Sequence, residues 1–203
     1  SGLAVVMLEE GAFHTRADFH GSVLARIAKL YSRMGLQATA GNVSIFLPTG
    51  SGVGGTTTIN AGTCLRAPPW VLQHWREEQS VPLLDADIEP YFEQVERWLD
   101  VATAPASTVG MQGVVIARGA DKLGIAHGPL PRNAPGCDGQ GLCCFGCPTD
   151  AKRSTNVSYL PAALDAGAML FHHARVEEVL VAGGRAVGVV ARAKGGSDQR
   201  LRV

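Results

Sequence analysis

Short runs of apolar residues flank a middle region in which apolar positions recur at helical spacing. The first run, Ala4–Leu8, is continuous and ends at an acidic pair and a glycine, residues 9–11. Such a run is typical of a strand buried on both faces of a parallel sheet. Towards the other end, residues 175–181 and 185–191 predict two strands that turn tightly at Gly183-Gly184.

Helical spacing predicts four helices between these strands. The first covers residues 22–34 and stops at Gly35, where a glycine suits a left-handed cap. A second starts at Asp87, whose carboxylate can cap it, and a third starts near Ser107. A short fourth helix covers 157–166. The order of elements predicts an α/β fold with a helical insertion and a closing β-hairpin.

Composition narrows the possible functions. Among 203 residues, 18 basic and 18 acidic side chains cancel, which argues against a nucleic acid or an anionic membrane as partner. No apolar stretch is long enough to be a transmembrane segment, and none has signal-peptide flanks. Four of the five cysteines fall within residues 137–147, which is no spread-out disulfide framework and favours a reducing, cytoplasmic location. Because both ends of the sequence lie inside strand-like runs, we expect an internal fragment of a longer protein.

The glycine-rich run Gly50–Gly62 is the strongest candidate for a binding segment. Its glycines let backbone N–H groups approach an anionic group, and the hydroxyls of Thr56 and Thr57 add donors. No lysine follows the glycines as in a Walker loop, and no clean strand precedes them as in a dinucleotide fingerprint. One interpretation is that the run binds a diphosphate or the edge of a flavin. An interpretation of equal weight is that it is a surface loop that binds no ligand.

Glu9 follows the first predicted strand. In dinucleotide-binding folds an acidic residue at such a strand end binds the ribose hydroxyls, some 20 residues after a glycine fingerprint. That fingerprint would precede Ser1, so Glu9 taken alone is more often a solvated charge.

Taken together, these motifs resemble the glucose-methanol-choline (GMC) oxidoreductases, FAD enzymes that oxidise alcohols. The resemblance rests on Val5–Gly11, on Gly54–Asn60, and on the segment from Cys144 to Leu164 with the hairpin that follows. It covers nearly the whole chain, with the motifs in the family's order. The cysteine-containing tail is similar to the branch of long-chain alcohol oxidases and related bacterial dehydrogenases.

The resemblance implies an incomplete Rossmann-like FAD/NAD(P)-binding fold and assigns roles to ten residues. Glu9 would bind the adenosine ribose, and Val176 would hold the adenine edge through its backbone. The other eight would lie along the pyrophosphate and flavin (Gly54, Gly55, Thr56, Thr57) or face the isoalloxazine (Asn60, Ala61, Gly62, Thr63). It also implies three parts: a first FAD-binding part at 1–64, a helical and irregular insertion on the substrate side at 65–150, and an FAD-binding return segment at 151–203.

The same resemblance bounds the function. It implies an FAD-dependent alcohol dehydrogenase or oxidase in which hydride passes to flavin N5. The family's catalytic histidine pair, or histidine and asparagine, matches no residue here, so no catalytic residue is assigned and the isolated chain is expected to be inactive. A small-molecule alcohol, weakly a hydrophobic or long-chain one, is the expected substrate, and the electron acceptor is undetermined. A non-catalytic nucleotide-binding module is the alternative from another class.

The cysteines Cys137, Cys143, Cys144 and Cys147 leave three alternatives open. Structural thiols or a local disulfide are favoured, and no metal site is assigned. The Cys-Pro ending resembles ferredoxin spacing, which makes an iron–sulfur relay the runner-up, but the adjacent Cys143 and Cys144 break that pattern. A zinc site would prefer spaced pairs.

Overall fold

The protein is described by a computed structural model over residues 2–79, 81, 85–194 and 200–202. Its backbone contacts divide it into two compact units, which are described separately. Unit 1 comprises residues 1–60, 142–150 and 154–203, and unit 2 comprises 61–141 and 151–153. The three sequence-based parts (1–64, 65–150 and 151–203) stay a prediction.

Unit 1 contains a parallel strand pair. Strand β1 (Val6–Leu8) pairs with β4 (Met169–Phe171), Val6 lying opposite Met169. The prediction of a strand buried on both faces is wrong, because β1 is only half-buried and the flanking Val5 is 43% exposed. The physical reason is that helices bury the faces of a parallel sheet, whereas among the described residues β1 packs mainly against the strands β4 and β5. Helix α5 (Tyr159–Asp165) precedes β4 and begins two residues later than the predicted start at 157.

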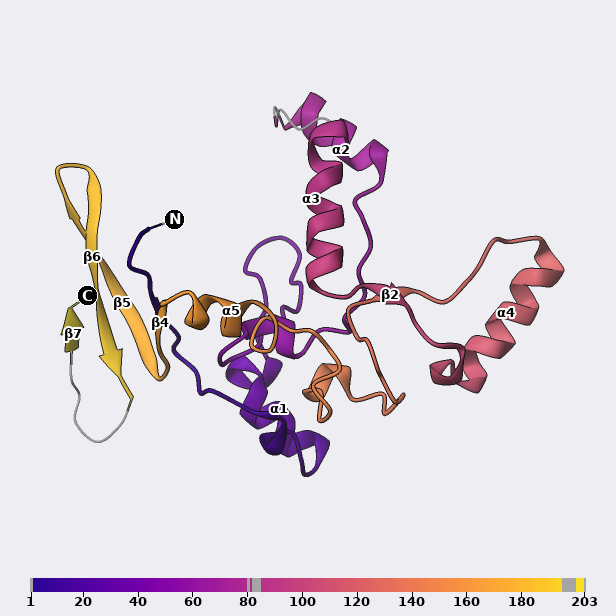
Figure 1. Ribbon diagram of the computed structural model, residues 1–203, viewed down its shortest axis with the longest axis horizontal. Coiled ribbons are helices and arrows are strands. Elements are labelled where there is room, and N and C mark those ends of the chain that lie inside the picture. The colour runs from indigo at the N-terminus through magenta and orange to yellow at the C-terminus, as the bar shows by residue number, and fades with distance from the viewer. Residues whose placement is uncertain (1, 80, 82–84, 195–199, 203) are drawn as a thin grey trace. The chain divides into compact units, whose positions relative to one another are not determined.

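The predicted hairpin is confirmed. Strands β5 (Ala174–Ala182) and β6 (Arg185–Ala193) are antiparallel, and β7 (Arg200–Arg202) pairs with β6 (Figure 1). Gly183 and Gly184 have φ angles of 57° and 73°, and two successive positive φ angles suit a two-residue turn that matches the strands' twist.

The first predicted helix is shorter than expected. Helix α1 (Val23–Leu30) starts at Ser22, whose hydroxyl accepts a hydrogen bond from the Ala25 amide. It ends where the next residues hydrogen-bond outside the helix: the Ser32 amide donates to the Thr49 carbonyl at 2.9 Å, and Tyr31 bridges to Gly50. A 3₁₀ turn at Ser32–Gly35 follows. Tertiary hydrogen bonds therefore override the helical pattern over residues 31–34.

A small core holds unit 1 together. Phe19, Leu30 and Ile59 are each at most 5% exposed and pack with Tyr31. Gly146 packs on the Phe19 ring so closely that a Cβ there would lie 2.4 Å from the ring. The irregular turns complete this unit: η1 (Arg16–Asp18), η3 (Gly55–Thr58) and η5 (Cys143–Phe145).

Unit 2 is mainly helical. It contains α2 (Pro69–Glu78), α3 (Asp85–Trp98), the short pair β2 (Ala102–Thr103) and β3 (Pro131–Arg132), the turn η4 (Ala106–Thr108), and α4 (Met111–Leu123). Helix α3 begins two residues before the predicted cap Asp87. The sequence predicts a third helix from about Ser107, but the residues there form the 3₁₀ turn η4, and α4 starts only at Met111. No helix of the described residues has the length and apolar character needed to cross a bilayer.

Candidate cofactor-binding site

The glycine-rich run folds into a tight turn within unit 1. Gly54 adopts a left-handed conformation (φ 97°), and η3 follows it. A Cβ at Gly54 would lie 2.8 Å from Cγ2 of Thr58 and 3.1 Å from Cβ of Asn156. Only glycine fits both the conformation and the space, so this backbone is fixed in a shape that other residues resist.

Threonine hydroxyls tie this turn to the return segment. The Thr57 hydroxyl donates to the Gly54 carbonyl at 2.6 Å and accepts from the Thr155 amide at 3.0 Å. The Thr155 hydroxyl donates to the same carbonyl at 3.2 Å. The Thr56 hydroxyl accepts from the Gly50 amide at 3.1 Å. Within the turn, the Thr57 hydroxyl therefore both donates and accepts, whereas the Thr56 hydroxyl accepts. Thr155, which the sequence analysis did not single out, is a further anchor of the turn.

Glu9 lies directly after β1 and is half-buried. Its Oε1 accepts a hydrogen bond from the Gly11 amide at 2.7 Å, while its backbone joins Phe171 and Ala174. A carboxylate held in this way has a fixed orientation and keeps acceptor capacity for a further donor.

Glu9 and Gly54, far apart in sequence, line the same cavity of about 250 Å³. Val53 and Thr155 join them, and the remaining walls are mostly apolar: Met7, Leu8, Tyr159, Leu160, Ala163 and Leu170. The structure thus brings a strand-end carboxylate and the glycine turn to one mostly apolar cavity.

Comparison with known proteins shows which family the chain belongs to. The family model described as GMC oxidoreductase matches residues 27–203. The chain belongs to the GMC oxidoreductase family. A GMC-type oxidoreductase of Mycobacterium tuberculosis is 40% identical over 199 residues, which are 97% of this chain and 32% of that protein. A long-chain-alcohol oxidase of Arabidopsis thaliana is 30% identical over 206 residues, 97% of this chain and 27% of the relative.

A solved structure supports the fold. Pyridoxine 4-oxidase from Mesorbium loti matches all of this chain and 43% of its own chain, with a TM-score of 0.60 and 15% identity. The chain spans about a third of the length of the curated relatives it matches. The GMC family is FAD-dependent and its N-terminal domain binds FAD, so FAD is the cofactor and this is a mixed α/β FAD-binding region.

The residues present fit FAD in two respects. The Glu9 carboxylate can accept from ribose hydroxyls. The turn leaves open space at Gly55, since a Cβ there would meet no atom within 4 Å. Val176 lies on β5, 41% exposed, and is not among the residues that line the cavity with Glu9. The role of each individual residue stays a prediction.

The last four predicted cofactor residues lie where the chain passes from unit 1 to unit 2, after residue 60. Asn60 ends the first segment of unit 1 and is exposed. In unit 2 the Ala61 carbonyl accepts from the Arg132 guanidinium at 2.6 Å, and Thr63 bridges to Arg132. Gly62 has a φ of 70°, and its carbonyl accepts from the Asn133 amide at 3.0 Å.

Two buried polar residues surround Gly62. A Cβ there would lie 2.6 Å from Oδ1 of Asn133 and 3.3 Å from Cγ of Lys152. Asn133 is 7% exposed and Lys152 only 1%. Burial also raises the pKa of the nearby Cys64 thiol, which lies 3.7 Å from the Gly62 carbonyl. No sequence pattern singles out Asn133 or Lys152, because burial of a lysine depends on the tertiary structure.

The four clustered cysteines are divided between the units: Cys143, Cys144 and Cys147 belong to unit 1, and Cys137 belongs to unit 2. The Tyr31 hydroxyl donates to the Cys144 carbonyl at 2.7 Å. None of the five cysteines, all of them described, forms a disulfide. Across the described ranges, no three histidine, cysteine or acidic side chains are grouped so as to hold a metal. The iron–sulfur relay is a question for metal analysis of the purified protein.

Proposed function

We propose that this chain is the FAD-holding part of an enzyme that oxidises an alcohol, with a hydrophobic or long-chain alcohol as substrate. The observation that carries the proposal is the shared cavity of Glu9 and Gly54. The Arabidopsis relative, named a long-chain-alcohol oxidase, supports the substrate class.

In this proposal each residue of the chain has a binding or positioning task. Glu9 accepts hydrogen bonds from ribose hydroxyls, and the Gly11 amide keeps its carboxylate oriented. Thr57 and Thr155 hold the Gly54 turn, so that its backbone lies against the cofactor without reorganising. The walls of the cavity are mostly apolar. Bound FAD supplies a two-electron acceptor for the hydride of the alcohol carbon. No residue of this chain is assigned as the base, and a reducing, cytoplasmic location remains part of the proposal.

The first experiment measures FAD affinity. The protein is expressed from its complete reading frame, stripped of flavin and titrated with FAD, with the change in flavin fluorescence as readout. Glu9→Gln, which removes the charge and keeps the shape, should weaken binding roughly tenfold because a charge-assisted hydrogen bond is lost. Glu178→Gln, an exposed position on β5, is the matched control and should bind as the wild type does. A protein that binds no flavin, or equal affinities for Glu9→Gln and the control, would refute the proposal.

The second experiment tests the substrate class. Reduction of the bound flavin is followed by its visible absorbance under anaerobic conditions, with alcohols of increasing chain length, choline and a sugar as separate substrates. The proposal expects faster reduction as the alkyl chain lengthens. Reduction by choline or the sugar alone would contradict the hydrophobic substrate while leaving the flavin assignment intact.

A further inference from the structure

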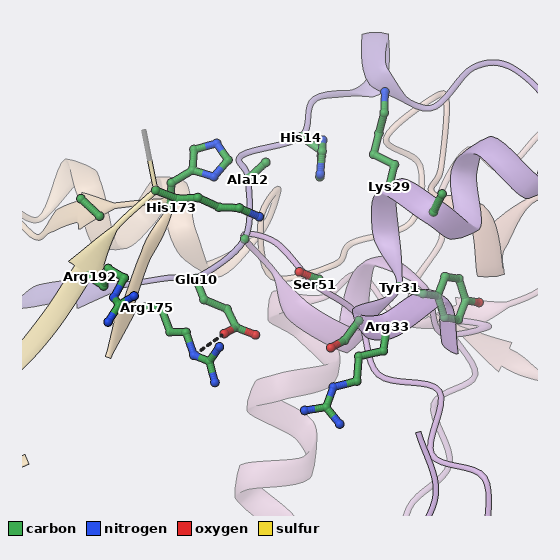
Figure 2. Close-up of a pocket in the computed structure, with 15 residues that line it drawn as sticks. Glu10, Ala12, His14, Lys29, Tyr31, Arg33, Ser51, His173, Arg175 and Arg192 are labelled. Atoms are coloured by element: carbon green, nitrogen blue, oxygen red, sulfur yellow. Dashed lines mark ion pairs between the residues drawn. The ribbon is translucent and has the colours of Figure 1, made fainter. Parts of the chain in front are cut away.

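A second, larger cavity lies in unit 1, with a volume of about 700 Å³. Glu10, Arg175, Arg192 and His173 stand on one side of it in Figure 2, and Lys29, Tyr31 and Arg33 on the other, with Ser51 between them. Its walls thus come from the segment after β1, from α1 with the following turn, and from the β5–β6 ladder. Glu9 and Gly54 do not line it. A volume in this range suits a ligand the size of a nucleotide.

The walls are strongly basic. Five lining side chains are lysines or arginines, and Glu10 is the single carboxylate among the lining residues: Lys29, Arg33, Arg175, Arg192 and Lys194 carry the positive charges. Three of these have acidic partners. Arg175 lies 3.6 Å from Glu10, Lys29 lies 3.7 Å from Asp18, and Arg192 lies 2.9 Å from Glu177. Within the described residues, Arg33 and Lys194 have no carboxylate within ion-pair distance, so the cavity keeps an excess of positive charge.

Arg33, which lines the cavity, has a backbone conformation that non-glycine residues avoid. Its φ is 49° and that of Met34 is 54°, both in the left-handed region that non-glycine residues avoid. Each such residue costs on the order of 1 kcal/mol. Hydrogen bonds to residues 49–51 stabilise the turn at Ser32–Gly35: the Ser32 amide donates to the Thr49 carbonyl, and the Ser51 amide donates to the Leu30 carbonyl. The fold therefore tolerates backbone strain at Arg33. Its guanidinium has no carboxylate partner among the described residues, and it lines the cavity.

His14 lines the same cavity. Burial lowers the pKa of His14, the Asp18 carboxylate opposes this by raising it, and Lys29 and His173 lower it further. Burial is the largest of these effects, and the two neighbours on the cavity wall, Lys29 and His173, act in the same direction.

We propose that this basic cavity binds a phosphate or diphosphate group, with the Arg33 guanidinium as its main partner and Ser51 as a hydroxyl donor. Arginine's planar fork matches phosphate oxygens in a way that a point charge does not. The group belongs to a phosphate-bearing ligand other than FAD, because Glu9 and Gly54, which we assign to the cofactor, do not line this cavity. The charge argument is independent of the proposed function, and only the distinction from FAD rests on it.

The test uses the protein from its complete reading frame and inorganic pyrophosphate as the probe. Its dissociation constant is measured by isothermal titration calorimetry, once with flavin removed and once with FAD loaded. We expect saturable binding that Arg33→Gln weakens roughly tenfold, as loss of one charge-assisted hydrogen bond implies. Arg33→Lys should restore part of it. Arg185→Gln, at an exposed position at the start of β6, is the matched control and should leave the constant unchanged.

Comparison of the flavin-free and FAD-loaded forms separates this ligand from FAD. We expect pyrophosphate to bind both forms equally and Arg33→Gln to leave FAD affinity unchanged. Pyrophosphate binding to the flavin-free protein alone, together with weaker FAD binding by Arg33→Gln, would place the diphosphate of FAD in this cavity and overturn the proposal. Absence of saturable pyrophosphate binding to either form, or equal binding by wild type, Arg33→Gln and Lys194→Gln, would overturn the proposal. Should Arg33→Gln not fold, Lys194→Gln carries the comparison. A protein that binds pyrophosphate but no flavin would fail the proposed function and leave this inference standing.

Discussion

A single methyl group at Gly11 should separate the two segments that we assign to the cofactor. Gly11 packs directly on the glycine-rich run: a Cβ there would lie 2.3 Å from the amide nitrogen of Gly52 and 2.6 Å from its Cα. Gly11 also donates to Glu9 and accepts from the His173 amide at 2.9 Å. Gly11→Ala therefore pushes the strand end away from the turn and disturbs the carboxylate that Gly11 orients.

The size of the effect follows from what the methyl would contact. All its close neighbours are backbone atoms, so no side chain can rotate away to relieve the overlap. Overpacking of a well-packed site costs about 1–3 kcal/mol, and rigid neighbours place Gly11→Ala at the upper end. Gly119→Ala is the matched control, because Gly119 lies within α4 and a Cβ there would meet nothing within 4 Å. The same methyl should stabilise that helix by about 0.5–1 kcal/mol.

Urea unfolding followed by far-ultraviolet circular dichroism measures both variants. Hydrogen exchange at the His173 amide adds a local readout, because that amide donates to Gly11. We expect faster exchange and a lower midpoint for Gly11→Ala, together with weaker FAD binding. Wild-type stability and exchange in Gly11→Ala would show that the two segments are not in contact and would refute the reasoning.

Three further predictions concern unit 1. Leu30→Ala, at a side chain 1% exposed, should destabilise the protein by about 2–5 kcal/mol in urea titrations, and a loss below 1 kcal/mol would mean that this core is not formed. Ser22→Ala removes the cap of α1 and should cost about 1 kcal/mol, whereas Ser22→Asp should retain most of the stability. Stability should fall as the pH drops through about 6.5, because the lowered pKa of His14 makes the folded state bind its proton more weakly than the unfolded state does. His14→Gln should reduce this pH dependence, and an unchanged slope would exclude His14 as its source.

The sequence predicted the local elements where local forces dominate. The hairpin at Gly183-Gly184 follows from turn chemistry between two β-branched runs, and the structure confirms it. Helix α1 starts at its Ser22 cap as the polar–apolar pattern requires. Its end was missed, because Ser32 and Tyr31 bond to residues 49–50, and no periodicity reports such a contact.

For the site, the sequence by itself supplied the residue types: a carboxylate after a strand, a run of glycines, and a motif order that identifies the family. The tertiary structure decided which of them meet. Glu9 and Gly54 line one cavity, while Val176 does not join them there. The anchoring role of Thr155 and the basic cavity at Arg33 arise only from packing between segments distant in sequence. The physical reason is the distance along the sequence between the residues that interact. Caps, turns and helical spacing depend on residues a few positions apart, whereas cavities, burial and charge clusters depend on distant residues that only folding brings together.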